Sequence, residues 1–305
     1  MRIIDPLTIP AYVITLAFAS FIILAVVLTD FTYDAAEMNR PVFSLAFMTV
    51  ASAWLSRRGL KIGSAIEGIA LFASVSFAAP FCAVILASLD FPLMDATLAE
   101  LDRPLLLGFQ RQDIILALTR YPIIFDTLRM IYESIATQPW ILLPLLWATG
   151  RETRGWVLVS AWAITVAVTL MIFTFVPAMG APPYFLDYMD TLRHARDGSL
   201  RTLGTQVLAG IITFPSFHAA AAVLLAWGFA PIPLIGRPLV VWNVLMFASA
   251  FLASHYLVDL IAGGLIGGAS IWASQHVLAW LIAKAGARHS APVDERPLLS
   301  APEGG

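Results

Sequence analysis

The chain has 305 residues, of which 59% are hydrophobic and 12% are charged, and its formal net charge is −2. Soluble domains carry about 25% charged residues, so this composition indicates a polytopic membrane protein and excludes a set of soluble domains. The near-neutral charge offers no basic surface for nucleic acid, and the single cysteine, Cys82, excludes an internal disulfide and a cysteine-based zinc site.

Eight apolar runs predict transmembrane helices, since about 20 such residues cross a bilayer. In chain order they are 11–29, 41–56, 64–89, 124–149, 155–177, 216–231, 238–256 and 258–283. Asp126, Arg129 and Glu133 occupy the first turns of the fourth run, whose apolar stretch proper is 140–147. Only Ser254–Asp259 separates the last two runs. We therefore expect an all-α polytopic transmembrane helical bundle of about eight spans.

Lysines and arginines in the short loops predict the orientation of this bundle. With eight spans they all fall on one side, the cytoplasmic one; they are Arg2, Arg57, Arg58, Lys61, Arg151, Arg154, Arg237, Lys284, Arg288 and Arg296. Both termini are then cytoplasmic, and the connections 90–123 and 178–215 lie outside, across what we expect to be the cell's inner membrane. Segment 91–122 alternates leucines with charged residues and predicts an interfacial helix or two. The polar tail 285–305 is predicted to be disordered.

Two short polar segments, Phe214–His218 and Ser254–Asp259, lie between apolar runs. A histidine or an aspartate at membrane depth is costly, which makes it a functional candidate. In the predicted topology both segments lie at the outer ends of spans, as does Pro177–Pro183 at the end of the fifth. The topology therefore brings three features that are distant in sequence to the same depth.

The residue types in these segments suit phosphoryl transfer. His255 and Asp259 are four residues apart, a spacing that on a helix stacks them on one face. A carboxylate bound to one imidazole nitrogen leaves the other nitrogen available as a nucleophile. His218 would donate a proton to the leaving group. Pro215 suits a helix start with Ser216 as its N-cap, and a helix N-terminus favours bound phosphate. The pattern predicts a covalent histidine intermediate at the outer membrane surface.

Two other interpretations fit the same residues. A lone intramembrane histidine such as His218 often only packs or forms a hydrogen bond between helices. Two histidines with one carboxylate could also bind a divalent metal. The outer segments contain no further cluster of ligands, so we expect neither a metal nor another cofactor.

The two segments, read as FPSFHAA and SHYLVDLIAGG, resemble the type 2 phosphatidic acid phosphatase superfamily. Pro215, Ser216 and His218 match its P-S-x-H motif, and His255 and Asp259 match the H-x-x-x-D that ends its third motif. The branch with aureobasidin-resistance-type inositolphosphorylceramide synthases is the most similar, because it shares further landmarks. These are the pair His255-Tyr256, Gly263-Gly264, Leu101-Asp102-Arg103 and Pro177–Tyr184.

The resemblance covers about residues 95–270 and implies a core of six helices. That core would be residues 63–284, with the interfacial segment 91–122 and the outer loop 178–215, and residues 1–62 would be an N-terminal two-helix addition. The resemblance also implies roles. His255 would be the nucleophile that becomes phosphohistidine, and Asp259 would orient it. His218 would protonate the departing alcohol, Ser216 would help to hold phosphate, and no metal would take part.

Three cations of the family are missing here. Its first motif has the form K-x6-R-P, and this chain has only Ala181-Pro182-Pro183. Ser249 stands where the third motif has an arginine. Because cations neutralise the charge on a transferring phosphoryl group, we expect other arginines to replace them. The candidates in the outer loop are Arg193, Arg196 and Arg201, and those in the interfacial segment are Arg103, Arg111 and Arg120.

We therefore expect an integral membrane lipid phosphatase or phosphotransferase. Its substrate would be a lipid phosphate or phosphodiester whose tails stay in the bilayer, and its site would face the non-cytoplasmic side. The alternative is a non-catalytic lipid-binding or transport protein on the same scaffold, which the missing cations favour.

Overall fold

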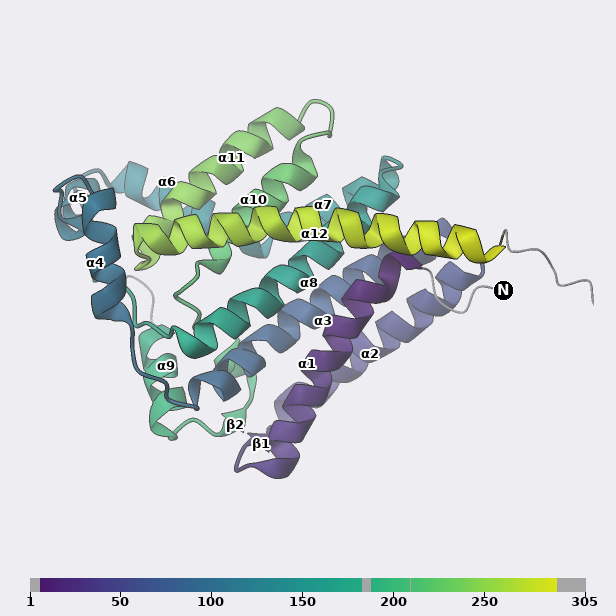
Figure 1. Ribbon diagram of the computed structural model, residues 1–305, viewed down its shortest axis with the longest axis horizontal. Helices are drawn as coiled ribbons and strands as arrows, with labels where there is room; N and C mark the ends of the chain where they lie inside the picture. Colours follow the sequence, from purple (N-terminus) through teal and green to yellow (C-terminus); the bar gives the residue numbers. More distant parts are fainter. Residues whose placement is uncertain (1–5, 183–187, 209, 290–305) are drawn as a thin grey trace, which may run out of the picture.

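The computed structural model describes residues 6–182, 188–208 and 210–289, and it is almost entirely helical (Figure 1). The α-helices are α1 Ile9–Leu28, α2 Ala35–Arg57, α3 Lys61–Ala87, α4 Asp95–Leu105, α5 Arg111–Thr119, α6 Pro122–Glu133, α7 Gln138–Ala148, α8 Glu152–Phe175, α9 Tyr188–Asp197, α10 Phe217–Phe229, α11 Gly236–Ser249 and α12 Leu257–His289. Short 3-10 helices are η1 Pro6–Thr8, η2 Ser134–Ala136, η3 Thr205–Val207 and η4 Ala250–Ala253. Strand β1 Thr32–Tyr33 pairs in parallel with β2 Thr202–Leu203. The expected all-α fold is confirmed.

Within the described residues, five helical segments are long and apolar enough to cross a membrane. They are Ile9–Leu28, Lys61–Ala87, Glu152–Phe175, Gly236–Ala253 and Leu257–Lys284, and α10 is a shorter apolar helix. The protein is therefore a polytopic integral membrane protein. The remaining two expected spans correspond to α2, which has 23 residues, and to the region of α6 and α7.

The expected fourth span, 124–149, is wrong as a single helix. The chain forms α6, then η2, then α7 instead. The first part carries Arg129 and Glu133, which form an exposed ion pair of 2.9 Å between Nε and Oε1. A proline also lies in the first turn of α7, at Pro139, where its missing N–H is tolerated. The polar and apolar halves of this run therefore fold as separate helices.

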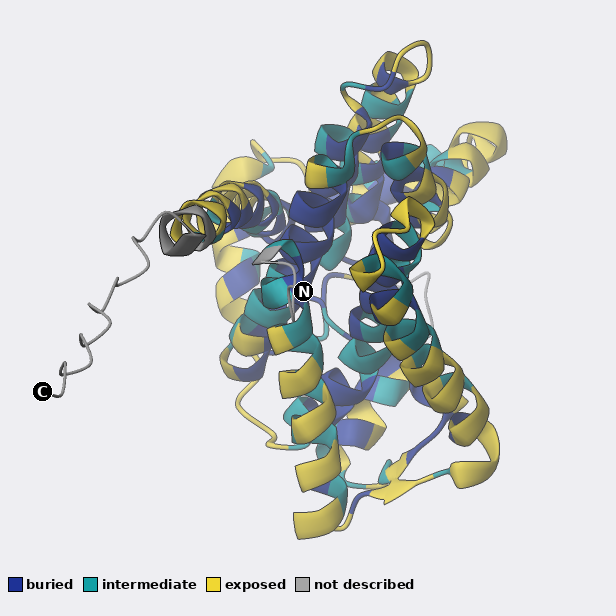
Figure 2. Cartoon of the chain, turned by 90° about the vertical axis from the view of Figure 1, so that its right-hand side faces the viewer, coloured by how far each residue is buried: buried dark blue, intermediate teal, exposed yellow. Residues whose placement is uncertain are grey.

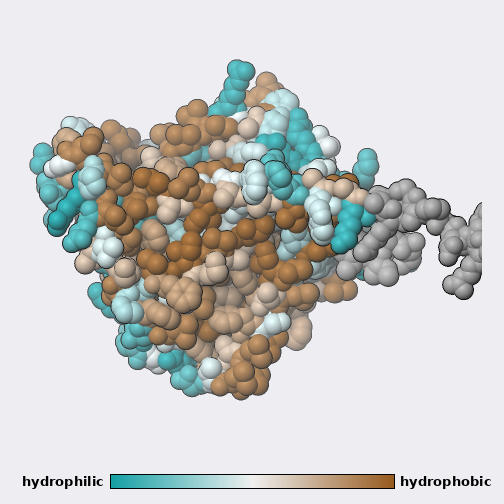
Figure 3. Space-filling view, in the orientation of Figure 1, coloured by the Kyte–Doolittle hydropathy of each residue, from teal (hydrophilic) through white to brown (hydrophobic). Residues whose placement is uncertain are grey.

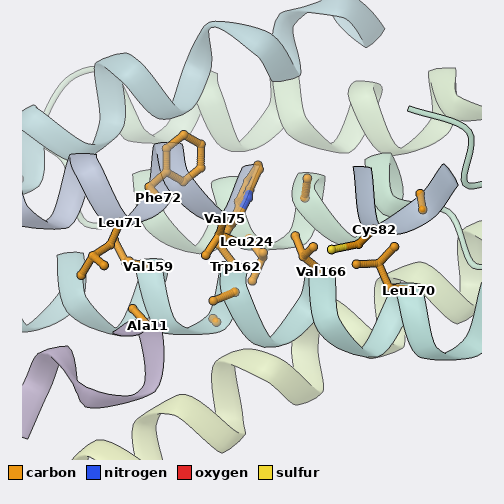
Figure 4. Close-up of a cluster of buried hydrophobic side chains, with 14 of the residues drawn as sticks. Ala11, Leu71, Phe72, Val75, Cys82, Val159, Trp162, Val166, Leu170 and Leu224 are labelled. Carbon is orange, nitrogen blue, oxygen red and sulfur yellow. The ribbon is translucent and has the colours of Figure 1, made fainter. Parts of the chain in front are cut away.

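Helices α3 and α8 form the centre of the bundle. Their facing side chains interdigitate, with Leu71, Phe72 and Val75 of α3 against Val159 and Trp162 of α8 (Figure 4). Burial decreases outward from this pair, and the outer faces of the peripheral helices are exposed (Figure 2). Large apolar side chains on an exposed face are costly in water and are satisfied by lipid tails. The arrangement fits a bundle surrounded by bilayer.

Polar and apolar surfaces are segregated along the molecule. Hydrophobic residues cover the middle of the visible face, and hydrophilic ones gather toward its margins (Figure 3). Helices α4 and α5 lie toward the left of Figure 1, near the start of α12, and α9 lies lower on the same side. The C-terminal part of α12 and the start of α1 lie toward the right. Helices α4 and α5, which fall in the segment expected to be interfacial, are therefore at the end of the bundle where α12 begins.

Candidate active site

His255 and Asp259 lie at the start of α12. His255 precedes the helix rather than forming its first turn, so the two residues are not stacked on one helical face as the spacing suggested. Instead the Asp259 carboxylate reaches back to accept a hydrogen bond from the Tyr256 backbone N–H at 2.9 Å. The same oxygen, Oδ2, lies 3.4 Å from Nδ1 of His255, at the long end of the hydrogen-bonding range. One carboxylate oxygen thus caps the helix and orients the imidazole.

This dyad is deeply buried. Asp259 is 0% exposed and His255 is 4% exposed. The other oxygen of Asp259, Oδ1, has no hydrogen-bond partner among the described residues. A buried carboxylate is stabilised only by the partners that it has, so the contact with His255 is energetically important.

Asp102 of helix α4 accepts hydrogen bonds from the start of α12. Oδ1 of Asp102 accepts a hydrogen bond from the N–H of Val258 at 2.9 Å, and the carboxylate also accepts one from Leu257. Asp102 therefore provides the capping oxygen that the residue before α12, a tyrosine, lacks. Asp102 is 2% exposed, and this burial raises its pKa above the ordinary value despite these bonds.

Two further residues hold the loops around the dyad. The Asp95 carboxylate accepts hydrogen bonds from the N–H groups of Met179 at 3.0 Å and Gly180 at 2.8 Å, and from the Tyr256 hydroxyl at 3.3 Å. The Arg111 guanidinium donates to the carbonyl oxygens of Pro182 at 2.5 Å and Phe251 at 2.6 Å. The interfacial segment thus positions both loops that flank His255.

The start of α10 lies against α12. Ser216 caps α10, because its Oγ accepts the Ala219 N–H at 3.3 Å, and its own N–H donates to the carbonyl oxygen of Asp259 at 3.1 Å. Gly263 makes this approach possible, since a Cβ at this position would overlap the Ser216 carbonyl oxygen. The capping role expected of Ser216 is therefore observed. The bond also links the helix that begins with Phe217 and His218 to the backbone of Asp259.

Tyr132 is the partner of His218. The two rings stack with centroids 3.9 Å apart and an interplanar angle of 12°, and the tyrosine hydroxyl lies 3.1 Å from Nδ1 of His218. Tyr132 is at the end of α6 and is 9% exposed. His218 and His255 therefore share one feature: each has its Nδ1 beside an oxygen partner, and this leaves Nε2 as the nitrogen available for chemistry.

Both histidines line one cavity of about 380 Å³. Most of its wall is apolar, and α3 and α8 contribute six of the thirteen lining residues, including Pro80, Trp162 and Val166. Such a cavity can hold a small polar head beside two imidazoles and place a hydrocarbon chain against the apolar wall. Its lining residues are Ser76, Ala79, Pro80, Ala83, Tyr132, Trp162, Val166, Gly210, Ile212, Phe217, His218, Ala253 and His255.

The sequence matches the family model described as the PAP2 superfamily over residues 96–273, more than half of the chain. The protein belongs to the PAP2 superfamily. Neither the curated proteins nor the solved structures gave a significant match. Members of the PAP2 superfamily are generally phosphatases or phosphotransferases. The matched region contains both histidines and Asp259.

The arginines expected to replace the family's cations lie in other contacts. Arg193 pairs with Asp190 at 3.1 Å, Arg196 with Asp90 at 2.6 Å and Arg201 with Asp30 at 3.0 Å. None of the described residues that line the cavity of this PAP2 protein is a lysine or an arginine. Phosphate binding by these three arginines stays a prediction.

Metal-ligating groups of at least three histidine, cysteine, aspartate or glutamate residues are absent from the described part of the chain. His218 and His255 direct their Nδ1 atoms to Tyr132 and Asp259 respectively, which is the pattern of two separately oriented imidazoles.

Sequence reasoning missed Tyr132 and the capping role of Asp102. Tyr132 lies in the run that we expected to be a single span, so it looked like one more residue facing lipid. Leu101-Asp102-Arg103 was noticed only as a family landmark, without a role. An acidic residue on a short amphipathic helix before the core is the only signal in the sequence, and it does not identify the helix end that the residue caps.

Proposed function

We propose that this protein is a lipid phosphatase or phosphotransferase that works through a phosphohistidine at His255. The observation that supports this most directly is the matched orientation of the two cavity histidines. Nδ1 of His255 lies beside Asp259 and Nδ1 of His218 beside Tyr132, at 3.4 and 3.1 Å. Each imidazole therefore presents Nε2 for reaction, one as a nucleophile and the other as an acid.

In the first step, Nε2 of His255 attacks the phosphorus of the bound lipid. The bond from phosphorus to the ester oxygen breaks as the nitrogen–phosphorus bond forms, and His218 gives its proton to the departing oxygen. The Asp259 carboxylate holds the Nδ1–H of His255 and stabilises the positive charge that develops on that ring. The products are a phosphohistidine and a free alcohol.

In the second step, water or the hydroxyl group of a second lipid attacks the phosphohistidine. His218 accepts the proton of the attacking group, the nitrogen–phosphorus bond breaks, and both histidines return to their starting forms. With a phosphomonoester substrate, attack by water gives free phosphate and attack by a hydroxyl gives a new phosphomonoester. With a phosphodiester substrate the histidine carries an alkyl phosphate, and attack by a hydroxyl then gives a new phosphodiester. Transfer of an inositol phosphate would follow if the protein belongs to the aureobasidin-resistance-type branch. The assignment to that branch depends on the sequence landmarks alone.

The phosphate would lie at the start of α10. The first turn of a helix has N–H groups without intrahelical partners and carries the positive end of the helix dipole. Ser216 caps this turn, and His218 stands in it. These groups, together with Arg193, Arg196 and Arg201 as more distant cations, would balance the phosphate charge in a cavity whose lining has no described lysine or arginine.

The predicted membrane topology indicates on which side of the bilayer the site lies. His255, which lines the cavity, directly precedes α12, whose start is bonded to Asp102 of the interfacial helix α4. The positive-inside pattern of the sequence predicts the non-cytoplasmic face for this end of the bundle. The apolar wall of the cavity from α3 and α8 suits a substrate whose hydrocarbon remains in the membrane. Substrate would therefore enter from the outer leaflet.

The test is a phosphate-release screen with purified protein in lipid vesicles. The panel is phosphatidate, isoprenyl pyrophosphates, phosphatidylglycerol phosphate and phosphosphingolipids, each with and without a lipid acceptor. Free phosphate identifies a phosphatase, and a new phosphate ester of the acceptor lipid identifies a transferase. His255→Ala and Asp259→Asn should each reduce turnover by at least about 10³-fold, the scale of losing a nucleophile or its orienting acid. Turnover that both variants retain would refute these roles.

One observation favours a non-catalytic lipid-binding or transport protein on the same scaffold. The described cavity lining lacks a cation, although a transferring phosphoryl group needs charge neutralisation. This alternative predicts that phosphatidate binds to the protein equally well after His255→Ala, and that no lipid in the panel loses phosphate. Measuring binding and release on the same preparations separates the two functions.

A further inference from the structure

The α1–α2 connection, taken as the loop 29–34 together with the first turn of α2 up to Glu37, contacts a distant segment of the chain. The N–H of Thr32 donates to the carbonyl oxygen of Arg201 at 2.8 Å, and the N–H of Asp34 donates to that of Leu203 at 3.1 Å. The hydroxyl groups of Thr32 and Thr202 lie 3.0 Å apart across this pairing of β1 and β2. The connection lies outside residues 96–273, which the family model matches.

Side chains reinforce the backbone pairing. Oε2 of Glu37 accepts hydrogen bonds from both the N–H and the hydroxyl of Thr205, each at 2.8 Å. Gly204 permits this approach, because a Cβ there would lie 2.8 Å from the same carboxylate oxygen. Arg201 pairs with Asp30 at 3.0 Å. The segment from residue 201 to 205 is thus held by charged groups as well as by the strand pairing.

An apolar layer lies beneath these contacts. Phe31 and Met38 belong to the same buried cluster as Leu203, Val207 and Ile211, and all five are at most 4% exposed. The guanidinium of the arginine at 201 also covers the Phe31 ring, with its central carbon 4.9 Å from the centroid. Burial of this layer makes the pairing a packed interface rather than a surface contact.

The held segment leads directly to the cavity. Gly210 and Ile212 line the cavity, and they lie three and five residues beyond Val207. Ile212 is followed, after Thr213, by the polar segment that begins at Phe214. A displacement at residues 201–207 would therefore move one wall of the cavity, because so few residues separate the two.

We propose that the α1–α2 connection is part of the substrate site: it holds segment 201–207 so that Gly210 and Ile212 form a fixed wall for the hydrocarbon part of the substrate. Glu37 is the positioning residue, because its carboxylate accepts two of the hydrogen bonds to this segment. The kinetic form of this inference rests on the proposed function. A wall beside the hydrocarbon binds ground state and transition state alike, so its loss should raise KM and leave kcat nearly unchanged.

The first test compares Glu37→Ala with Glu100→Ala, which removes an exposed carboxylate on α4. The substrate is the lipid phosphate that the wild-type protein dephosphorylates fastest in the panel, in a long-chain and a short-chain form. We expect Glu37→Ala to raise KM about fivefold for the long chain, the scale of one lost hydrogen bond, with kcat within about twofold. KM for the short chain should stay unchanged. Equal kinetics in Glu37→Ala and wild type would overturn the proposal.

A rescue experiment separates positioning from general destabilisation. Thr32→Cys and Thr202→Cys, added to Glu37→Ala, put two thiols at paired positions whose side chains already point toward one another. The native Cys82 is only 1% exposed, so it leaves the new pair to oxidise alone. Oxidation should return KM to the wild-type value, and reduction should raise it again. A KM that does not depend on the redox state would contradict the proposal.

A readout without turnover keeps this inference independent of the proposed function. Ile212→Cys places a thiol in the cavity wall, and its rate of modification by a maleimide reports how firmly the wall is held. We expect the rate of modification to rise about fivefold when Glu37→Ala is added, because the rate is proportional to the fraction of molecules in which this wall has opened. If wild-type protein releases no phosphate, the proposed function fails while this measurement still tests the wall. An unchanged rate would refute the inference.

Discussion

Gly263 of α12 packs against the Ser216 carbonyl group at the start of α10. An alanine Cβ at position 263 would overlap the Ser216 carbonyl oxygen and would lie 3.1 Å from the Ser216 carbonyl carbon and 3.2 Å from Cβ of Ala219. Carbon atoms in contact are ordinarily about 3.5–4.0 Å apart. Because backbone atoms and a buried Cβ cannot rotate away, Gly263→Ala requires the two helices to separate by about 0.5–1 Å.

Separation of the two helices would change the positions of the catalytic candidates. The N–H of Ser216 donates to Asp259, and His218 lies two residues after Ser216, so a shift between α10 and α12 changes the distance between the two histidines. A displacement of about 1 Å at a catalytic centre can cost about 10²-fold in rate. Overpacking also destabilises by about 1–3 kcal/mol. We expect Gly263→Ala to lower kcat by about 10- to 100-fold while the protein remains folded.

Gly268→Ala is the matched control on the same helix. A Cβ at Gly268 meets no atom within 4 Å, and alanine is the better helix former by about 1 kcal/mol. The assay is phosphate release by purified protein in vesicles, with thermal unfolding in detergent measured on the same samples. Gly268→Ala should keep wild-type turnover and unfold at an equal or higher temperature. Wild-type kcat in Gly263→Ala would refute the inference that this contact sets the geometry of the site.

Two further substitutions test other contacts. Tyr132→Phe removes the hydroxyl beside His218 and should lower kcat about tenfold for alkyl phosphates. The loss should be much smaller for an aryl phosphate, because its leaving group needs little protonation. The exposed Tyr121→Phe is the control, and an equal loss of kcat with both leaving groups would contradict the role of Tyr132. Burial raises the pKa of Asp102, which means that the ionised carboxylate is less favourable in the folded than in the unfolded protein. The free energy of unfolding should therefore fall as pH rises from about 3.9 through the raised pKa. Asp102→Asn should remove this fall in melting temperature between pH 4 and 7, and a fall that persists would show another origin.

The composition and the spacing of a few residues were sufficient for the fold class. A chain that is 59% hydrophobic has to bury its backbone polar groups in helices when it enters a bilayer. The apolar runs therefore predicted most of the helices of the bundle. They failed at residues 124–149, because hydropathy over a window does not show that the charged Arg129 and the proline at 139 divide the run.

The candidate residues were also visible, but their arrangement was not. The spacing of His255 and Asp259 suggested two side chains on one helical turn, whereas His255 lies before the helix and the carboxylate reaches back to the helix start. Helix boundaries depend on which groups cap them, and here one cap is Asp102, more than 150 residues earlier in the chain. A contact of that range has no local signature.

The sequence by itself determined an integral membrane helical protein with two histidines and an aspartate at polar breaks between apolar helices. Periodicity and hydropathy are local properties, so they are readable without coordinates. Tertiary structure alone decided that Tyr132 stacks on His218, that Asp102 caps α12, and that the α1–α2 connection holds a wall of the cavity. These contacts join segments distant in sequence, and they depend on close packing between helices, which no local pattern encodes.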